Sequence, residues 1–599
     1  MRSYPPLQGF LTMKKFLKYT LICLVSLLII SYFYFILPFW GIPFNAQRHG
    51  NPPLTPAWAL ECWLWEDDNN TSAYADTLLQ GYAKHDIPVR TLLIDSPWSQ
   101  RYNDFNVDEE KYPEPQKWFK DLQNRGYRTI LWMTSMVDSH SKDTKVKDST
   151  PWFNAAAKNG YLVGSGNQIK WWKGKGGFID YTNPKAMKWW KGMQKEVMDY
   201  GVDGWKLDGT CTLFRQQLGP IPFLYQKAFA GWLTTRQYMD LYYRNEYANG
   251  LAVNPEFITL ARAMDRGYHP EGFAPIDAAP VTWVGDQKHY WQSKTDSGIK
   301  EEKGKDIALD GVQGFESAIE SILKSAALGY NIIGSDIAGF SGDKIPPRLY
   351  IRWTQFSTFC GLFMNGGHGE RALWKRSAQE LEIIRKFSWL HTELVPYMYH
   401  FVVKANKGGR VLQKPVEGKF HYMFGDDLLI APIYKDETQT EVQLPEGKWR
   451  YWFNDNDVLQ GPLTFQKAFP LDEYPVYVKE GAVIPMNISR AYTGLGDSTS
   501  TDFLTWLIYP SDKSEFTVYD TKTRQSTTLF VTKSSTVISL NTEGKSLPSI
   551  YNIHMTGRPK KILLDGKTLS NNEFKFDAIK QRLTIKYQNA ENATCQVYL

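Results

Sequence analysis

The chain has 599 residues, which is enough for about four domain-sized units. Its net charge is +6, and the basic residues are spread along the chain, which excludes a dedicated nucleic-acid surface. Hydrophobic residues make up 43% of the chain, which excludes disorder as its main state. Aromatic residues make up 15%, and this predicts either an aromatic core or a surface that stacks on flat, apolar ligand faces.

A long segment near the N-terminus carries no charge. No charged residue occurs from Tyr19 to Gln47, and Lys14, Lys15 and Lys18 precede this segment. The segment is longer than a secretory signal of about 7–15 apolar residues and close to the length of about 20 that spans a bilayer. We therefore expect a cytoplasmic tail over 1–18, a transmembrane signal anchor over 19–44 and an extracytoplasmic remainder, whether periplasmic, extracellular or lumenal. Cleavage of the segment would make the protein secreted.

From residue 54 to about residue 400, short apolar runs alternate with helical patterns. The predicted strands are residues 57–64, 90–94, 128–133, 203–207, 257–260, 281–284, 331–333 and 363–365. The clearest helices between them are residues 71–84, 115–125, 186–200, 315–328 and 347–359. Eight strand–helix alternations predict an α/β fold, a (β/α)8 TIM barrel over 54–400, with an insertion at about 134–183.

Beyond residue 400 the pattern changes to short alternating strands with turns rich in Gly, Asp, Asn and Pro. This pattern predicts two β-sandwich-type domains, a proximal one over 401–489 and a distal one over 490–599. The boundary falls in a stretch rich in Gly, Ser and Thr at 489–501.

No motif for a metal ion or another cofactor occurs. The five cysteines form no CxxC pair, and the chain has no HExxH motif. No GxGxxG or Walker-type loop follows a predicted strand. We therefore expect neither a metal nor a nucleotide cofactor.

Polar side chains follow the predicted barrel strands at the end where this fold places its active sites. In strand order they are Glu66 and Asp67, Asp95, Trp132 (on the third strand), Asp208, Arg262, Asp286, Asp336 and His368. A single aspartate in such a position is more often a helix cap or a turn residue. Because the C-terminal ends of barrel strands meet at one face, we expect these side chains to converge on one pocket.

Two of these carboxylates suit the hydrolysis of an acetal. One carboxylate attacks the anomeric carbon, while the other protonates the leaving oxygen and later activates water. Asp208 and Asp286 follow the fourth and sixth strands, on one side of the barrel mouth, where the separation of about 5–5.5 Å in a retaining pair can be reached. Other carboxylates and Arg262 would bind sugar hydroxyls, and tryptophan faces would stack on the ring.

Several motifs, in order, resemble glycoside hydrolase family 31. They are TWVGDQ at 282–287, GSDIAGF at 334–340, RWTQ at 352–355, GDDLLIAP at 425–432, LPEGKW at 444–449 and YPVYVKEGAVIP at 474–485. The resemblance implies a (β/α)8 barrel followed by proximal and distal β-domains. It also implies a retaining α-glycosidase that hydrolyses terminal α-linked sugars by double displacement.

The resemblance further implies the roles of individual residues. Asp208 matches the nucleophile of the family, and Asp286 matches its general acid/base. The positions that match contacts to the bound sugar are Asp95, Trp132, Arg262, Asp336 and His368.

The sequence around Asp208 bears on the choice of sugar. The α-glucosidases of the family usually have W-x-D-x-N-E around the nucleophile, whereas this chain has WKLDGT. Lys206 and the segments WEDD and DSPWS are more similar to the family's α-galactosidase branch. We therefore expect an α-galactosidase, with an α-glucosidase or α-xylosidase of the same family as the alternative. A non-catalytic carbohydrate-binding protein on the same fold is the alternative from another class.

Several further residues have both a functional and a structural interpretation. Lys206 either acts on the pKa of Asp208 or forms a structural ion pair. Glu66 and Asp67 either recognise a hydroxyl or begin the following helix. The tryptophans expected to stack on sugar are Trp65, Trp98, Trp132 and Trp283, while Trp171 and Trp172 in the insertion form either a subsite wall or an anchor for the loop.

Overall fold

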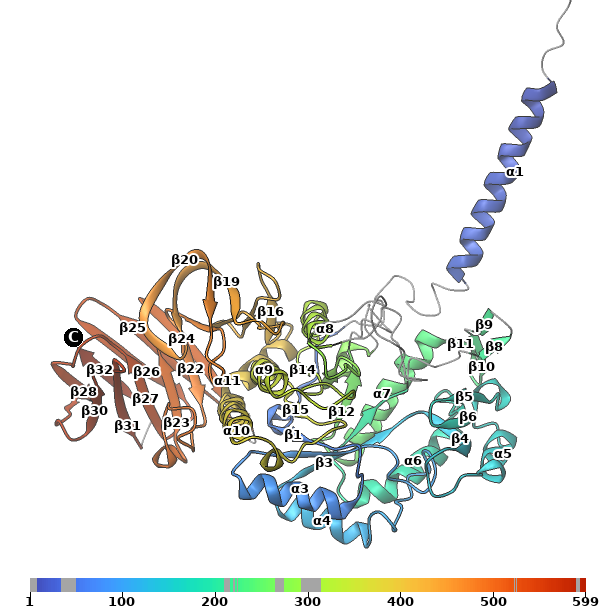
Figure 1. Ribbon diagram of the computed structural model, residues 1–599, viewed down its shortest axis with the longest axis horizontal. Helices are drawn as coiled ribbons and strands as arrows, with labels where there is room; N and C mark the ends of the chain where they lie inside the picture. Colours follow the sequence, from blue (N-terminus) through green and yellow to red (C-terminus); the bar gives the residue numbers. More distant parts are fainter. Residues whose placement is uncertain are drawn as a thin grey trace, which may run out of the picture.

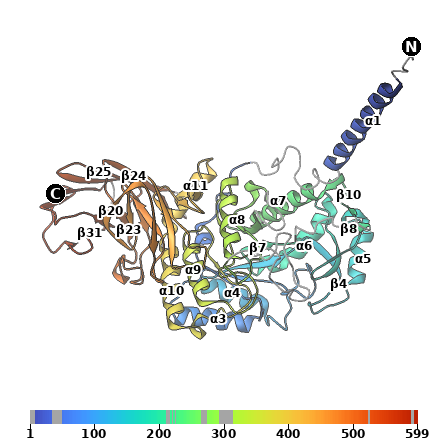
Figure 2. The same ribbon diagram turned by 45° about the horizontal axis from the view of Figure 1, so that its top comes forward.

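The structure is a computed structural model that describes residues 8–33, 50–209, 216–218, 221–223, 225–263, 274–291, 314–521, 523, 525–588 and 593–599. Figures 1 and 2 show a helix that projects from the molecule, a central barrel with helices around it, and β-sheets beside the barrel. The projecting helix and the C-terminus lie at opposite ends of the molecule.

Eight parallel strands form the barrel. In sheet order they are β14 (Ile333–Gly334), β13 (Val281–Trp283), β12 (Ile258–Arg262), β7 (Gly204–Leu207), β3 (Arg128–Met133), β2 (Thr91–Ile94), β1 (Trp63–Leu64) and β15 (Met364–Asn365). An isolated parallel bridge between Asp336 and Met364 joins the two edges of this sheet. The predicted barrel is confirmed, and its C-terminal face carries the polar residues described below.

Helices surround the barrel (Figure 1). They are α3 (Ser72–Lys84), α4 (Pro115–Asn124), α6 (Pro184–Asp199), α7 (Thr235–Val253), α8 (Phe315–Leu328), α9 (Pro347–Thr358), α10 (Ala378–Glu393) and α11 (Val395–Asn406). The starts follow ordinary capping chemistry, since the side chains of Thr71 and Asn183 accept backbone N–H groups at the first turns of α3 and α6.

The first predicted strand, over 57–64, is mostly not a strand. Ala57–Leu60 forms a 3-10 helix, and only Trp63–Leu64 pairs in the barrel as β1. Trp63 Nε1 donates to the carbonyl of Ala59 at 3.1 Å and holds the two pieces together. A short, wholly apolar run has no periodicity that would distinguish a buried strand from a buried helical turn.

Two excursions from the barrel lie on the side of β3 and β7. The predicted insertion contains β4 (Met136–Ser141), α5 (Thr150–Lys158), β5 (Ile169–Trp171) and β6 (Gly174–Phe178), and its strands form an antiparallel sheet in the order β4-β6-β5. Before α7 come two hairpins that the sequence analysis did not predict. They are β8 (Gln216–Leu218) with β9 (Ile221–Phe223), and β10 (Tyr225–Ala228) with β11 (Gly231–Thr234).

Where the structure describes it, the C-terminal part contains three sheets. The first has the order β16 (Gln413–Pro415), β17 (Tyr422–Phe424), β18 (Leu428–Ile430), β21 (Val476–Lys479), β19 (Gln439–Tyr451), β20 (Asn454–Ala468). The second has the order β22 (Val483–Met486), β23 (Leu504–Ile508), β27 (Ser549–His554), β31 (Arg582–Tyr587), β30 (Phe574–Asp577). The third has the order β24 (Lys513–Tyr519), β25 (Ser526–Lys533), β26 (Val537–Gly544), β32 (Thr594–Tyr598), β28 (Lys561–Leu564), β29 (Lys567–Thr568).

The two last sheets fit the predicted sandwich, whereas the proximal part differs from the prediction. On β25, buried Thr527, Leu529 and Val531 alternate with more exposed neighbours, as expected for a sheet with one face on a core. The proximal strands instead form one six-stranded sheet in the part of the chain that the structure describes. Its partner layer is the barrel, so it needs no second sheet to cover its apolar face.

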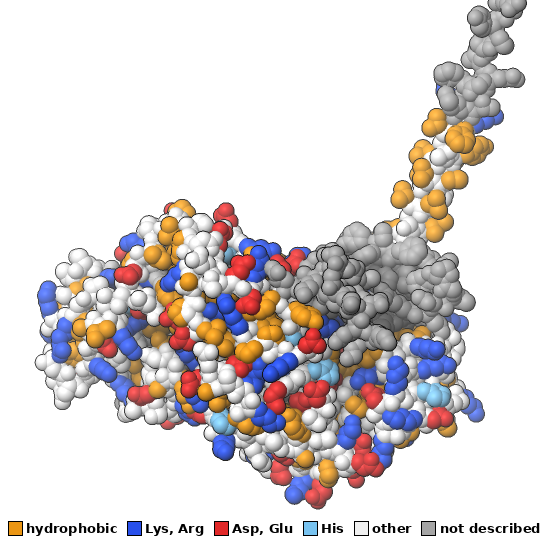
Figure 3. Space-filling model, in the orientation of Figure 1, with side chains coloured by type: hydrophobic (Ala, Val, Ile, Leu, Met, Phe, Trp, Pro, Cys, Tyr) orange, Lys and Arg blue, Asp and Glu red, His pale blue; other side chains and the backbone are white. Residues whose placement is uncertain are grey.

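Helix α1 (Gln8–Ser31) overlaps the predicted anchor at 19–44, of which residues 34–44 lie outside the described residues. Its apolar side chains, among them Leu21 and Leu28, are exposed (Figure 3). No helix within the described ranges has both the length and the apolar character needed to cross a membrane, so the predicted transmembrane helix is not supported.

Arg352 on α9 connects the barrel to the proximal sheet. Its side chain is 2% exposed, and Nη1 donates to the carbonyl of Glu473 at 2.6 Å. Nη2 donates to the carbonyls of Phe469 at 2.9 Å and Pro470 at 3.1 Å. One guanidinium therefore satisfies three backbone acceptors in the connection between β20 and β21.

We predict that Arg352→Ala destabilises the protein by about 3 kcal/mol, because each buried acceptor left without a donor costs about 1–3 kcal/mol. Thermal unfolding should show a midpoint several degrees lower. Arg348→Ala is the matched control on the same helix, since Arg348 makes a partly exposed ion pair with Asp436 at 3.2 Å. Such a pair contributes about 0–1 kcal/mol. Equal midpoints for the two variants would contradict the prediction.

Candidate active site

Asp208 follows β7 at the C-terminal face of the barrel and accepts hydrogen bonds from three groups. The Gly209 backbone N–H donates to Oδ1 at 2.8 Å, and Trp132 Nε1 donates to Oδ2 at 3.2 Å. Arg262 Nη2 donates to Oδ1 at 3.0 Å. Burial by itself would raise the pKa of the Asp208 carboxyl, but the charges of Arg262 and Lys206 outweigh burial and lower that pKa. Asp208 is therefore a carboxylate at neutral pH.

Arg262, at the end of β12, contacts both members of the predicted catalytic pair. Its Nη2 lies 3.0 Å from Asp208 Oδ1 and 3.3 Å from both oxygens of Asp286. The 3.0 and 3.3 Å contacts, placed end to end, allow at most about 6.3 Å between the nearest oxygens of the pair. The Asp286 side chain is 41% exposed and that of Asp208 15%, so Asp286 lies on the solvent side of the pair.

Lys206, on β7, is buried among carboxylates and aromatic rings. Its Nζ donates to Asp95 Oδ2 at 2.7 Å and lies 4.2 Å from the ring centre of Trp65 and 5.5 Å from that of Trp283. Burial would lower the pKa of Lys206, but the surrounding carboxylates, Asp95 first, outweigh it and raise that pKa. Lys206 therefore has both roles that the sequence left open, since it forms an ion pair and its charge also acts on Asp208.

Asp336, beyond β14, accepts a hydrogen bond from Trp65 Nε1 at 3.2 Å. Burial raises the pKa of Asp336 to about 7, against the opposing charge of Lys206. Trp65 in turn stacks on Phe340, with ring centres 5.9 Å apart and an interplanar angle of 14°. Gly366 leaves room for this arrangement, because a Cβ atom there would lie 1.7 Å from the Trp65 ring.

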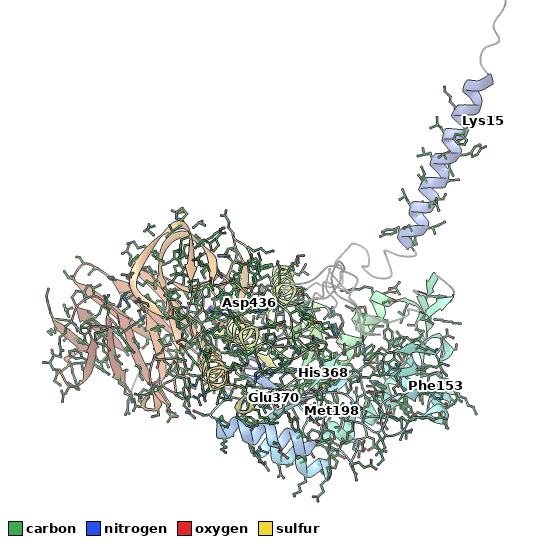
Figure 4. The ribbon with its side chains drawn as sticks, in the orientation of Figure 1. Lys15, Phe153, Met198, His368, Glu370 and Asp436 are labelled. Atoms are coloured by element: carbon green, nitrogen blue, oxygen red, sulfur yellow. The ribbon has the colours of Figure 1, made fainter. Side chains whose placement is uncertain are left out.

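His368 follows β15 and lies in the barrel part of the molecule (Figure 4). Its Nε2 is 3.0 Å from Asp67 Oδ2, and its Nδ1 is 2.7 Å from Asp68 Oδ1. The hydrogen bond with Asp67, assisted by that with Asp68, raises the pKa of His368 to about 9, although partial burial opposes this. The ends of β1 and β15 are thus joined by a charged cluster. Asp68 has no distinguishing signal in the sequence, because an aspartate after a strand is an ordinary turn residue.

Of the two interpretations of Glu66, the structure favours a structural role over recognition of a hydroxyl. Its carboxylate accepts the backbone N–H groups of Asp68 and Asn69, both at 2.7 Å, and so closes the turn after β1. Glu66 holds this turn in shape, and Asp67 is the residue that reaches His368.

The tryptophans expected to stack on sugar are mostly buried behind the polar groups. Trp65, Trp98, Trp132 and Trp283 are each at most 3% exposed. Trp98 Nε1 donates to the carbonyl of Trp132 at 2.7 Å, and Trp132 stacks on Trp171 of the insertion at 6.4 Å and 12°. The buried rings therefore orient Asp208, Lys206 and Arg262 from behind.

Asp138 on β4 is a buried acid that the sequence analysis missed, because nothing local distinguishes it from a surface aspartate. It is fully buried, and Trp171 Nε1 donates to its Oδ1 at 2.9 Å. Burial raises the pKa of Asp138 to about 9. Asp138 therefore keeps its proton at neutral pH.

We predict that Asp138 makes thermal stability fall as the pH rises from about 5 to about 8. An unfolded aspartate loses its proton near a pH of about 4. In the folded protein the pKa of Asp138 is about 9, so between about pH 5 and 8 the folded state holds a proton that the unfolded state has lost. The free energy of unfolding therefore falls as the pH rises through this interval. Asp138→Asn keeps the shape without the titration, so its unfolding midpoint should drop less between these two pH values than that of the wild type.

The matched control for this experiment is Asp121→Asn, which removes one carboxyl from the exposed side of α4. Its midpoint should depend on pH as the wild type does. If Asp138→Asn also keeps the wild-type dependence, Asp138 is ionised in the folded protein and the prediction is wrong.

No group of three His, Cys, Asp or Glu side chains in the described ranges is arranged to hold a metal ion. The carboxylates at the barrel mouth contact Lys206 and Arg262 instead. A pair of carboxylates at the C-terminal face of a parallel barrel is an arrangement that suits a glycosidase.

The family models bear out this class. A model described as the TIM-barrel domain of glycosyl hydrolases family 31 matches residues 52–299 and 306–401. A model of the C-terminal domain of the same family matches residues 399–484. The chain therefore belongs to glycoside hydrolase family 31, as its motifs indicated.

The chain is similar to several named proteins, each at low sequence identity. An α-xylosidase of Emericella nidulans is 24% identical over 73% of this chain and 54% of its own length. Alpha-glucosidase 2 of Bacillus thermoamyloliquefaciens is 22% identical over 86% of this chain and 66% of its own length. The chain thus spans less than two thirds of either relative. A Flavobacterium johnsoniae family 31 dextranase, solved with isomaltotriose, shares the fold with a TM-score of 0.78 at 22% identity, over 92% of this chain and 72% of that one.

Proposed function

We propose that the protein is a retaining α-glycosidase that removes terminal α-linked sugars by double displacement. The observation that carries the proposal is the Arg262 guanidinium, which contacts Asp208 and Asp286 with one nitrogen. The limit of about 6.3 Å that this sets on their nearest oxygens suits a retaining pair at about 5–5.5 Å. An inverting pair stands about 6.5–9.5 Å apart.

The different surroundings of the two carboxylates support different roles. Asp208 has a lowered pKa and three hydrogen-bond donors that orient it, which suits a nucleophile that attacks the anomeric carbon. Asp286 is more exposed, which suits a group that first gives a proton to the leaving oxygen and then takes one from water. In the first step the bond from the anomeric carbon to the leaving oxygen breaks as the bond to Asp208 forms. Water then breaks the ester to Asp208.

The remaining polar groups would hold the hydroxyls of the sugar at the nucleophile. Asp95 and Asp336 offer carboxyl oxygens close to Lys206, and Asp67 with His368 lies on the side of β1 and β15. These groups are already held by hydrogen bonds and ion pairs within the protein, so binding costs little additional ordering.

We predict that azide distinguishes the two carboxylates by the anomer of its product. Asp286→Ala should lose activity mainly on substrates with poor leaving groups, and azide should attack the ester on Asp208 to give an α-glycosyl azide. Asp208→Gly should lose about a thousandfold or more in kcat, and azide should take the place of the carboxylate to give a β-glycosyl azide from an α-glycosyl fluoride. NMR of the products decides between the anomers.

The same anomer from both variants would contradict the assigned roles. Substantial activity of Asp208→Asn, with a wild-type unfolding midpoint, would remove Asp208 as the nucleophile. A wild-type protein that binds sugars but hydrolyses none would favour the non-catalytic carbohydrate-binding protein.

For the sugar itself, the relatives favour the alternative over the α-galactoside that the sequence predicted. The relatives named above are an α-xylosidase and an α-glucosidase, and neither is an α-galactosidase. We therefore propose an α-xyloside or α-glucoside as substrate. These two sugars share an equatorial 4-hydroxyl, whereas that of galactose is axial.

We predict that kcat/KM for an aryl α-xyloside or α-glucoside exceeds that for the aryl α-galactoside by at least about tenfold. This ratio corresponds to about 1.4 kcal/mol, which is what one hydroxyl contact contributes. Initial rates with the three substrates at matched leaving group measure this. A preference for the galactoside would restore the interpretation of WKLDGT given above and leave the catalytic proposal intact.

A further inference from the structure

Tyr242, on α7, is fully buried behind the candidate nucleophile. Its hydroxyl donates to the backbone carbonyl of Asp208 at 3.2 Å and lies at the same distance from the carbonyl of Met133. We infer that Tyr242 is a positioning residue, which orients the Asp208 carboxylate through the backbone and does not itself contact the substrate. The inference rests on the proposed function of Asp208 as the nucleophile.

The hydroxyl of Tyr242 reaches the carboxylate through a single peptide unit. The carbonyl of Asp208 and the N–H of Gly209 belong to the same planar unit, so the direction of one fixes the direction of the other. Tyr242 holds the carbonyl, and the N–H donates to Asp208 Oδ1 at 2.8 Å. A rotation of this peptide unit would break both hydrogen bonds together. Tyr242 therefore acts on the carboxylate although its hydroxyl contacts only backbone.

The backbone at this point needs a contact from outside the strand to hold it. Strand β7 ends at Leu207, and Gly209 has a φ of +80°, in the left-handed region. Glycine reaches many other backbone conformations at little cost, so the chain here does not select one orientation by itself. The N–H of Asp208 donates to the carbonyl of Met133 at 3.0 Å. The Tyr242 hydroxyl thus lies where the end of β3 meets the residue after β7.

Helix α7 holds Tyr242 in a fixed position. The helix packs against β7 and β12, and one turn beyond Tyr242 it carries Glu246, which is 1% exposed. The Glu246 carboxylate accepts Trp190 Nε1 at 2.8 Å and Gln194 Nε2 at 2.7 Å, both from α6. A shift of α7 would leave these buried groups without partners, at a cost of about 1–3 kcal/mol each. The hydroxyl is therefore presented from a rigid support.

The Tyr242 side chain is a hydrogen-bond donor at neutral pH. Burial raises the pKa of Tyr242 well above its ordinary value, and the nearby acids Glu246 and Asp208 act in the same direction. Its ring packs against the rings of Tyr243 and Tyr181, with centres 5.3 and 6.0 Å apart. Phenylalanine would keep this packing and remove only the hydroxyl, so its effect reports the hydrogen bond.

Two tyrosines of α7 form a matched pair for the test. Tyr238 is also fully buried, one turn before Tyr242, and its hydroxyl donates to the carbonyl of Ile179 at 2.6 Å. Tyr242→Phe and Tyr238→Phe each lose one buried hydroxyl that donates to backbone. Both variants should therefore fold, with unfolding midpoints lowered to a similar extent. They differ in that Tyr242→Phe loses a hydrogen bond at the nucleophile.

The measurement is covalent labelling by a 5-fluoro-α-glycosyl fluoride of the preferred sugar. An Asp208 oxygen forms a bond to the anomeric carbon as the carbon–fluorine bond breaks and fluoride leaves, and mass spectrometry locates the label. In Tyr242→Phe the labelling rate at saturation should fall about tenfold or more, because a displaced nucleophile attacks more slowly. The concentration that gives half of this rate should change by less than about twofold, because the contacts to the sugar remain. Tyr238→Phe should keep both wild-type values.

The outcomes separate this inference from the proposal on which it rests. An unchanged labelling rate in Tyr242→Phe overturns the positioning role and leaves the α-glycosidase intact. An equal fall in both variants also overturns it, because the loss would then follow from any missing hydroxyl on α7. A weaker half-saturation at an unchanged rate would assign Tyr242 to sugar binding and overturn it as well. A wild-type protein that carries no label on Asp208 and hydrolyses no α-glycoside refutes the proposed function, and the inference falls with it.

Discussion

Two buried cations, Lys206 and Arg262, hold the carboxylates at the mouth of the barrel together. Four aspartates gathered at one end of a barrel would repel one another, and burial raises the pKa of one of them, Asp336, to about 7. Lys206 pairs with Asp95, and Arg262 contacts Asp208 and Asp286. The charges of these two cations lower the pKa of Asp208 and keep it ionised.

Aromatic rings hold these cations in place. The ring of Trp283 lies 4.7 Å from the Arg262 guanidinium and 5.5 Å from Lys206, and Trp65 lies 4.2 Å from Lys206. Flat rings with negative faces are suitable neighbours for desolvated cations. Trp65 and Trp283 thus serve the charged network.

The insertion after β3 extends this organisation beyond the barrel. Its sheet β4-β6-β5 carries Asp138, Trp171 and Trp172, and the two tryptophans connect it to Trp132 and to Gly209. One excursion therefore supports the ring that donates to Asp208 and also places Trp172 against Gly209. This division suits a fold in which loops at the C-terminal face change specificity while the barrel stays the same.

The sequence by itself predicted the barrel and placed Asp95, Asp208, Arg262, Asp286 and Asp336 at the ends of its strands. It could do so because the alternation of apolar runs with helical patterns is visible locally and all strand ends meet at one face. The order of its motifs also indicated the family. Only the tertiary structure decided that Glu66 closes a turn, that Asp68 joins His368, that Asp138 is buried and that the proximal sheet is single. These features depend on burial and on contacts between residues distant in the chain. A local sequence pattern does not show which side chain will be buried in the folded protein.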